Sequence, residues 1–504
     1  MSVLLLLLAL TSALLTWNVY RPSYSGARLS FISFFSGWLT GELAPHHIGM
    51  QALMALLLIM SGALDSRLGE LGLLILLCSW TALGYEYWSA TGTIEHVEHA
   101  LRRGLGGDYR ERIHRDHRGG FDSRIRWRPI LKPFPISHPE VECIHDIRYL
   151  RVRGIDLKLD IYRHRSIPEN CPTLMQVHGG GWVIGSRKEQ GLPLMNQMAS
   201  RGWCCISVSY RLSPHATFPE HLIDLKHAIR WIKENGRQYG ANPDFLVVTG
   251  GSAGGHLASL LALTANDPEY QPGFKDIDTS VAGCVPFYGI YDFTDREGRL
   301  YHDGMMKLLE RKVMKASIEE DPEAYRKASP VDRLHEAAPP FFVIHGDRDT
   351  LAPVSEARAF VAALQEVSSS PVAYAEVPGG QHAFDLFPSL RSQAVIDAVD
   401  RFLSWIYSDY LAKREAAVSS EDSADRLEEN VSPAQVEAAE TRSPAKAKNK
   451  AKKPASRKRS ARTKVTEAAA PADSGQAAEA DGGAREQSSP DSEKTPSASD
   501  QNPA

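Results

Sequence analysis

The hexapeptide Gly250-Gly251-Ser252-Ala253-Gly254-Gly255 decides how this chain is organised. It follows a short apolar β-type run at residues 245–249, and it contains the pattern Gly-x-Ser-x-Gly with Ser252 at its centre. A serine on a sharp strand-to-helix turn projects its oxygen above the sheet, and flanking glycines avoid the clash that a Cβ would cause there. The stretch therefore predicts a nucleophilic serine.

A second glycine-rich stretch, His178-Gly179-Gly180-Gly181-Trp182, follows another apolar run at residues 173–177. Backbone N–H groups in such a loop can bind the oxyanion that forms when a serine attacks a carbonyl group. Together, the two stretches predict acyl transfer through a serine nucleophile. Spacing alone does not tell which N–H groups of the loop face the oxyanion.

The other catalytic groups are expected after the serine in the order acid, then histidine. The strand-like run 341–344 leads to Asp349, and the run 373–377 leads to His382. Both residues thus follow carboxyl ends of strands, on the edge expected for Ser252, where open α/β sheets place their ligands. We predict that Asp349 is the acid and His382 the base.

Four nearby residues compete for these roles. Asp347 is the alternative acid, but its spacing from the preceding His345-Gly346 pair is less favourable than that of Asp349. His345 follows its strand too closely to be the base. His178 is expected to hold the glycine loop by hydrogen bonding, and Asp292 to be a turn or cap residue.

Residues 140–408 resemble the α/β-hydrolase superfamily, specifically the bacterial esterases similar to hormone-sensitive lipase. The matching features are His178 to Gly181, Tyr210-Arg211-Leu212-Ser213-Pro214, Ser252 in its turn, Asp349 in the pattern His-Gly-x-x-Asp-x-Leu, and His382. The resemblance implies a carboxylic ester hydrolase without metal or cofactor, with Gly180, Gly181 and Ala253 as oxyanion donors. One departure is Gly251, where the family usually has aspartate.

Alternating strand and helix patterns predict a mostly parallel sheet with helices on both faces. Further strands are expected at 147–161 (two strands around a turn), 204–210 and 281–288, and helices at 222–239, 357–367 and 392–406. The charged insertion 299–336 lies where members of the family carry part of a substrate lid. We assign residues 140–410 to the α/β-hydrolase catalytic domain.

Residues 1–90 are expected to anchor the chain in a membrane. The runs 3–20, 48–64 and 71–85 carry no charge, although the third is marginal for a span of about 20 residues. Residues 29–41 are too short to span and are interpreted as an interfacial or re-entrant segment. A cleaved signal peptide is the alternative for 3–20, but a basic region before the apolar run is missing.

Residues 91–139 are interpreted as a basic juxtamembrane linker. Its cations are Arg102, Arg103, Arg110, Arg112, Arg115, Arg118, Arg124, Arg126, Arg128 and Lys132. Such a cluster favours the cytoplasmic side of a membrane, so a multi-pass protein with a cytoplasmic catalytic domain is expected. The histidine pairs 96/99 and 114/117 could suggest a metal, but no cysteine or clear carboxylate accompanies them, and no metal site is predicted.

Residues 411–504 are expected to be a disordered tail, because few hydrophobic residues remain to form a core. Its basic run at 446–464 is interpreted as a solvated segment, with contact to anionic lipid as the next alternative and nucleic acid as an improbable partner. The net charge of the whole chain is −4. The six scattered cysteines form no disulfide pattern, which fits a reducing compartment.

The sequence thus predicts a membrane-anchored serine esterase or lipase that acts on a small ester or a lipid-like substrate. An amidase, formamidase or peptidase on the same scaffold is the alternative, because the serine machinery alone does not exclude it. A non-catalytic binding module is a third interpretation. The complete set of Ser252, Asp349 and His382 argues against that third reading.

Overall fold

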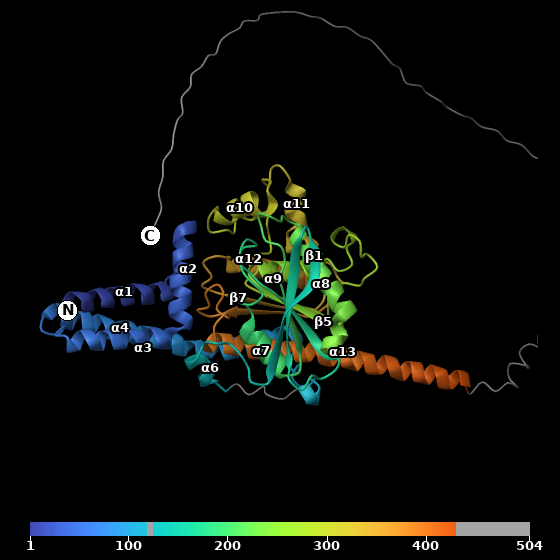
Figure 1. Cartoon of the computed structure of the whole chain (residues 1–504), viewed down its shortest axis with the longest axis horizontal. Helices are drawn as coiled ribbons and strands as arrows, with labels where there is room; N and C mark the ends of the chain where they lie inside the picture. The colour runs from blue at the N-terminus through green and yellow to red at the C-terminus, as the bar shows by residue number, and fades with distance from the viewer. Residues whose placement is uncertain (118–123, 430–504) are drawn as a thin grey trace, which may run out of the picture. The chain divides into compact units, whose positions relative to one another are not determined.

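The computed structural model describes residues 1–117 and 124–429 of the 504-residue chain. Figure 1 shows the arrangement of the elements. The helices are α1 (Ser2–Tyr20), α2 (Ala27–Glu42), α3 (Ala44–Met60), α4 (Arg67–Ser89), α5 (Thr93–Leu105), α6 (Trp127–Leu131), α7 (Leu192–Ser200), α8 (Glu220–Asn235), α9 (Ala253–Leu263), α10 (Gly304–Leu308), α11 (Pro322–Lys327), α12 (Val354–Val367) and α13 (Leu390–Glu429). The strands are β1 (Val141–Val152), β2 (Ile155–His164), β3 (Cys171–Val177), β4 (Cys204–Val208), β5 (Ala241–Gly251), β6 (Gly283–Phe287), β7 (Phe341–Gly346) and β8 (Val372–Val377).

The eight strands form one sheet in the order β1-β2-β4-β3-β5-β6-β7-β8. The β1–β2 and β2–β4 pairs are antiparallel, and every later pair is parallel. The parallel strands end at the same edge of the sheet, so the loops after β3, β5, β7 and β8 gather there (Figure 1). The mostly parallel sheet predicted from the alternating pattern is confirmed, and so is the α/β-hydrolase fold that the family resemblance implies.

Two apolar layers enclose the sheet. Strand β5 contributes to both layers. Leu246 and Val248 belong to one buried cluster, and Phe245 and Val247 belong to the other. This is the alternation that a strand covered on both faces requires. Helices α8, α9 and α12 supply the first cluster, and α5, α7 and α13 supply the second.

The segment expected to be a linker contributes a core helix instead. In α5, Val97, Ala100, Leu101 and Leu105 are buried at helical spacing in the second cluster. Gly104 lets α5 approach β8, because a Cβ at this position would lie 2.6 Å from the Cα of Ala373. The interpretation of residues 91–139 as a linker is therefore wrong for α5. The basic side chains of this segment dominated the sequence pattern and obscured its apolar stripe.

Several cations of this segment are paired rather than free. Arg110 lies 2.7 Å and Arg102 2.9 Å from Glu98, and Arg126 lies 3.0 Å from Asp397 in α13. Arg118, which the sequence pattern also included, lies outside the described residues.

Two of the described helices are long and apolar enough to cross a membrane, α1 and the helix that begins at Arg67 and includes α4. Helices α2 and α3 are long and apolar enough to cross a membrane only when they are taken together as one segment. They are bent by 87° at the break between them. The run 71–85, the marginal one by sequence, therefore lies in a full-length candidate span. Residues 48–60 of the run 48–64 lie in α3, which has 17 residues and is too short to qualify alone, and residues 61–64 form a turn.

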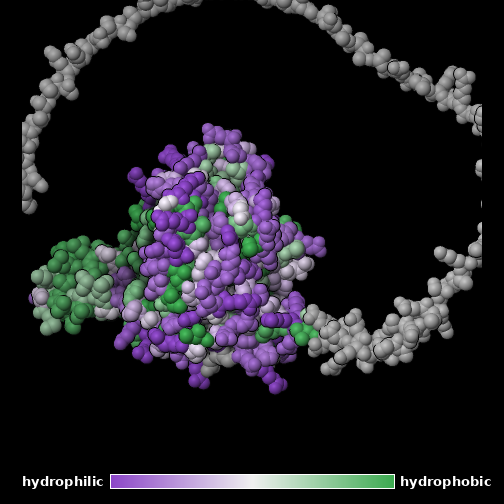
Figure 2. Space-filling model, turned by 45° about the vertical axis from the view of Figure 1, so that its right-hand side comes forward, coloured by the Kyte–Doolittle hydropathy of each residue, from purple (hydrophilic) through white to green (hydrophobic). Residues whose placement is uncertain are grey.

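Helices α1, α3 and α4 form a bundle (Figure 1). Buried polar side chains connect them: the Ser12 hydroxyl lies 2.7 Å from the Gln51 side-chain oxygen and 2.8 Å from the Ser79 hydroxyl. The outer surface of the bundle is strongly apolar, as Figure 2 shows, with residues such as Leu4, Leu57 and Leu74 more than half exposed. Hydrogen-bonded polar residues inside and apolar residues outside are typical of helices packed in lipid.

The last described helix continues past the expected end of the catalytic domain at residue 410. Helix α13 ends at Glu429, so residues 411–429 are helical. Most of the expected disordered tail, including the basic run at 446–464, lies outside the described residues.

Candidate active site

Ser252 occupies the sharp turn between β5 and α9. Its φ is 58° and its ψ is −123°, a strained conformation for a residue with a side chain. Its N–H donates to the Phe287 carbonyl oxygen at 2.9 Å, and its own carbonyl oxygen accepts from the His256 N–H at 3.0 Å. Gly254 must lack a side chain, because a Cβ there would lie 2.1 Å from the Val177 carbonyl oxygen. The turn has the geometry expected of a nucleophile elbow.

The loop after β3 passes directly beside this turn. A Cβ on Gly179 would lie 3.1 Å from the Cβ of Ser252. Gly180 and Gly181 have φ values of 116° and 57°, a backbone that side chains disfavour. The structure therefore brings the two glycine-rich stretches together, as the sequence predicts. The assignment of Gly180, Gly181 and Ala253 as oxyanion donors stays a prediction.

His178 shapes this loop rather than acting as a base. Its Nδ1 lies 2.9 Å from the Gly179 carbonyl oxygen, and its ring stacks on Tyr210 with centroids 4.5 Å apart. The Tyr210 hydroxyl donates to the His178 carbonyl oxygen at 3.0 Å. Burial lowers the pKa of His178 to about 4, which keeps this ring neutral near pH 7.

Asp349 and His382 meet at the edge of the sheet. The Nδ1 atom of His382 lies 2.6 Å from Oδ2 of Asp349, and the other carboxylate oxygen accepts the N–H groups of Leu351 and Ala352, each at 2.8 Å. Burial alone would raise the pKa of Asp349, but interactions with His382 and His345 outweigh it and hold the pKa well below its usual range. This carboxylate is therefore ionised and fixed in orientation.

Asp347 has a different environment. Its Oδ1 accepts the Gly379 N–H at 2.7 Å, so it ties the loop after β7 to the loop that carries His382. His345 is fully buried, and its Nε2 lies 3.1 Å from the Ala352 carbonyl oxygen and 3.2 Å from Oδ2 of Asp349. The choice of Asp349 rather than Asp347 as the acid stays a prediction.

Sequence reasoning missed Tyr288, a tyrosine that packs against His382 and against Gly251. The Tyr288 ring lies 4.6 Å from the His382 ring, centroid to centroid, and it fills the space beside Gly251 next to the Ser252 turn. Its hydroxyl donates to the Asp385 carboxylate, and both residues are buried. Burial raises the pKa of Asp385 and, together with Asp385, that of Tyr288. No local motif marks this pair, because its members are distant in sequence.

Two segments outside the sheet complete the surroundings of the site. Phe34 of α2 meets the His382 ring edge-on at 5.8 Å. In the insertion 299–336, Leu308 of α10 lies 3.4 Å from the position of a Cβ on Gly181. The insertion therefore lies next to the glycine-rich loop that follows β3, and its role as part of a lid stays a prediction.

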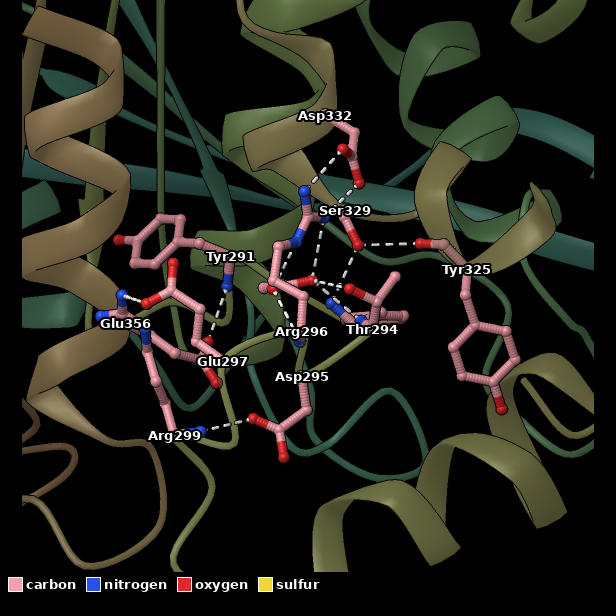
Figure 3. Close-up of polar contacts among 12 residues, drawn as sticks. Tyr291, Thr294, Asp295, Arg296, Glu297, Arg299, Tyr325, Ser329, Asp332 and Glu356 are labelled. Atoms are coloured by element: carbon pink, nitrogen blue, oxygen red, sulfur yellow. Dashed lines mark hydrogen bonds and ion pairs between the residues drawn. The ribbon is translucent and has the colours of Figure 1, made fainter. Parts of the chain in front are cut away.

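Asp292 is a turn residue, as its sequence position suggests. Its Oδ1 accepts both the N–H and the hydroxyl of Thr294, at 2.9 and 2.6 Å, and its carboxylate pairs with Arg296. Figure 3 shows Thr294 and Arg296, with Arg296 also paired to Asp332. Glu356 lies in the same view and accepts the Tyr291 N–H at 3.1 Å. Burial raises the pKa of Glu356 to about 8. This network holds the loop after β6 and contains none of the predicted catalytic residues.

The two histidine pairs have few acidic neighbours, and His114 Nδ1 lies 3.6 Å from the Asp116 carboxylate. Within residues 1–117 and 124–429, no group of three or more His, Cys, Asp or Glu side chains could hold a metal ion. His96 contacts the Gly92 carbonyl oxygen at 2.9 Å, and His117 packs against Tyr407. All six cysteines are unpaired, and four of them, Cys171, Cys204, Cys205 and Cys284, are buried.

Comparison with known proteins gives relatives with named activities. The BD-FAE family model matches residues 159–364. Esterase LipQ of Mycobacterium tuberculosis is 40% identical over 66% of this chain and 79% of its own length. The probable carboxylic ester hydrolase LipM of the same organism is 39% identical over 80% of this chain and 93% of its own length. The chain belongs to the carboxylesterases similar to hormone-sensitive lipase. It is a carboxylic ester hydrolase.

Solved structures of esterases show weaker likeness. A truncated carbohydrate esterase from gut microbiota has a TM-score of 0.45 and 22% identity over 52% of this chain and 96% of its own. A butyrate-bound esterase from Thermogutta terrifontis has a TM-score of 0.45 and 23% identity over 56% of this chain and 96% of its own.

The departure of this carboxylesterase from the family's usual motif has a structural reason. A Cβ at Gly251 would lie 2.7 Å from the Tyr288 hydroxyl oxygen and 2.8 Å from a ring carbon. Atoms essentially never approach a Cβ so closely, so Tyr288 occupies the space that an aspartate would need. Gly251 and Tyr288 are therefore mutually dependent.

Proposed function

We propose that this carboxylesterase hydrolyses its ester through an acyl-enzyme on Ser252, with His382 as the base and Asp349 as the acid. The observation that carries the proposal is the 2.6 Å contact between His382 Nδ1 and the buried, ionised Asp349. Tyr288 packs on the His382 ring and against Gly251, which directly precedes the strained turn of Ser252. A histidine held this way has its other ring nitrogen available to a nucleophile.

The geometry supports the following sequence of steps. Nε2 of His382 accepts the Ser252 proton as the hydroxyl oxygen attacks the ester carbonyl carbon. The N–H groups of Gly180, Gly181 and Ala253 bind the resulting oxyanion, and loss of one such donor costs about 3 kcal/mol of barrier. His382 then protonates the leaving alcohol, and water, activated by the same nitrogen, releases the acid.

Ester and amide substrates separate this proposal from its alternative. A panel of p-nitrophenyl esters and matched p-nitroanilides, assayed on the full chain and on Ser252→Ala, measures both activities. We expect ester hydrolysis that is lost in Ser252→Ala, with little anilide hydrolysis. Anilide turnover as fast as ester turnover would favour an amidase or peptidase. Ester turnover that survives the substitution would remove Ser252 from the mechanism.

The N-terminal helices support a membrane anchor of three spans. Helix α1 runs toward the catalytic domain, α3 runs away from it and α4 returns, while α2 crosses their domain-proximal ends (Figure 1). At about 1.5 Å per residue, the 17 residues of α3 are about 25 Å long, close to the thickness of the hydrocarbon core. In this arrangement α2 is the interfacial segment. The contacts of Ser12 with α3 and α4 argue that α1 is retained rather than cleaved.

The same arrangement favours a cytoplasmic catalytic domain. Arg21 directly follows α1 and Arg28 lies in α2, whereas Asp65 lies in the turn between α3 and α4. Figure 1 shows α2 at the end of the bundle nearer the catalytic domain and the turn between α3 and α4 at the other end. Basic residues near spans favour the cytoplasmic side. An alkaline phosphatase insertion in the turn at residue 65 should be active, and a fusion after residue 429 should be inactive. The reverse result would place the domain on the outer face.

A further inference from the structure

A carboxylate from the membrane helices lies between the two loops that carry the acid and the base. Glu86, near the end of α4, is 5% exposed. Its Oε1 atom accepts from Arg348 Nη1 at 2.9 Å and from Arg391 Nη2 at 2.8 Å. Charged residues in apolar helices are costly and usually have a function, so a buried glutamate at this junction needs an explanation.

Glu86 belongs to a buried cluster of carboxylate and guanidinium groups. Arg391, which is 2% exposed, also donates to Glu42 of α2 at 3.3 Å. Two carboxylates from the membrane helices thus face two guanidinium groups from the catalytic domain. A buried charge that loses its partner is strongly destabilising, so each member depends on the others.

Both arginines are attached to the catalytic loops. Arg348 directly precedes Asp349, and its backbone N–H donates to the Gly380 carbonyl oxygen at 3.0 Å. Arg391 Nε donates to the Pro378 carbonyl oxygen at 2.8 Å, four residues before His382 in the chain. Glu86 therefore holds the loop of the acid through one arginine and the loop of the base through the other.

Further contacts join the same loops to the first two helices. Arg348 Nη1 donates to the Val19 carbonyl oxygen at 2.8 Å, and the Thr350 hydroxyl donates to the Ser30 carbonyl oxygen at 3.0 Å. Phe34 packs against the His382 ring. Residues on both sides of Asp349 are thus fixed by α1, α2 and α4.

We propose that Glu86 is a positioning residue for ester hydrolysis, so that the membrane helices form part of the catalytic apparatus as well as an anchor. The proposal rests on the roles of Asp349 and His382 given above. Catalytic groups must be held within about 0.5 Å of their working geometry by surrounding residues. A misplacement of about 1 Å caused by a remote change can lower the rate about 100-fold.

Kinetics of Glu86→Gln in the full chain, in lipid nanodiscs, test the proposal. The amide keeps the shape but loses the charge that both arginines need. With p-nitrophenyl butyrate, we expect kcat to fall about 10- to 100-fold while KM changes by less than about twofold. Glu86→Asp keeps the charge and should recover part of kcat.

Asp400→Asn is the matched control. Asp400 lies in α13, as Arg391 does; its buried carboxylate pairs at 2.7 Å with the partly exposed Arg201, and neither residue belongs to the catalytic loops. The Asp400→Asn variant should lower the Tm about as much as Glu86→Gln does, without lowering kcat. If Glu86→Gln lowers the Tm like the control but keeps the wild-type kcat, the residue is only structural and the proposal is wrong. Ser252→Ala tests the mechanism separately from the role of Glu86. Activity that is retained in Ser252→Ala would overturn the serine mechanism itself.

Discussion

Replacement of Gly251 by alanine tests how the Ser252 turn and the histidine are packed. The backbone at Gly251 does not have positive φ, so alanine fits its conformation and only space is limiting. The added Cβ would meet three atoms of Tyr288 at 2.7, 2.8 and 3.0 Å, where ordinary contact begins at about 3.4 Å. Tyr288 must therefore move, although it is buried and hydrogen-bonded to Asp385.

The expected magnitude follows from this overlap. Overpacking of this kind costs about 1–3 kcal/mol of unfolding free energy, which lowers the Tm by about 2–4 °C per kcal/mol in a domain of about 150–250 residues. Tyr288 also packs on the His382 ring, so its displacement moves the base. We expect kcat to fall by about 10- to 100-fold.

Thermal unfolding and p-nitrophenyl ester kinetics measure both effects. Gly107→Ala is the control, because no atom lies within 4 Å of a Cβ there and its φ is not positive. The double variant Gly251→Ala/Tyr288→Phe lacks the Tyr288 hydroxyl oxygen, the atom closest to the added Cβ. The losses of Tm and kcat in the double variant should therefore be smaller than the sum of the losses in the two single variants. Wild-type Tm and kcat in Gly251→Ala, equal to those of the control, would refute the packing argument.

Two further predictions concern titratable groups. Asp349→Asn should lower kcat by about 10⁴-fold, because the wrong histidine tautomer is stabilised. Asp347→Asn loses only the hydrogen bond to the Gly379 N–H and should lower kcat far less. If kinetics show the reverse ranking, Asp347 is the acid. Glu356, whose pKa burial raises to about 8, keeps a proton in the folded state that the unfolded chain loses near its usual pKa of 4.5. The unfolding free energy should therefore fall by about a few kcal/mol as pH rises from about 5 to 8. Glu356→Gln should remove this loss, which is measured as a smaller fall of the Tm over the same pH range. An unchanged slope in the variant would show that Glu356 ionises normally.

The sheet and the position of the site could be predicted because their signals are local. The turn at Ser252 needs glycines at fixed offsets, and Asp349 and His382 each follow a buried strand directly. Strand ends in a parallel sheet share one edge, so the sequence order was enough to bring these residues together.

The remaining features depend on contacts between distant segments. Tyr288 and Asp385 pair across the sheet edge, and no pattern in the sequence marks either residue. The apolar stripe of α5 was hidden among arginines, and its partner is β8. The contacts of Glu86 with two arginines of the catalytic domain could not be inferred, because each lies in a different sequence segment.

The most direct test of the account is where a fluorophosphonate probe attaches. The full chain in lipid nanodiscs is treated with the probe, and the modified peptide is located by mass spectrometry. The account predicts a single labelled residue, Ser252, and no labelling of a folded Ser252→Ala variant with wild-type Tm. Labelling at another serine, or labelling that persists in Ser252→Ala, would contradict it.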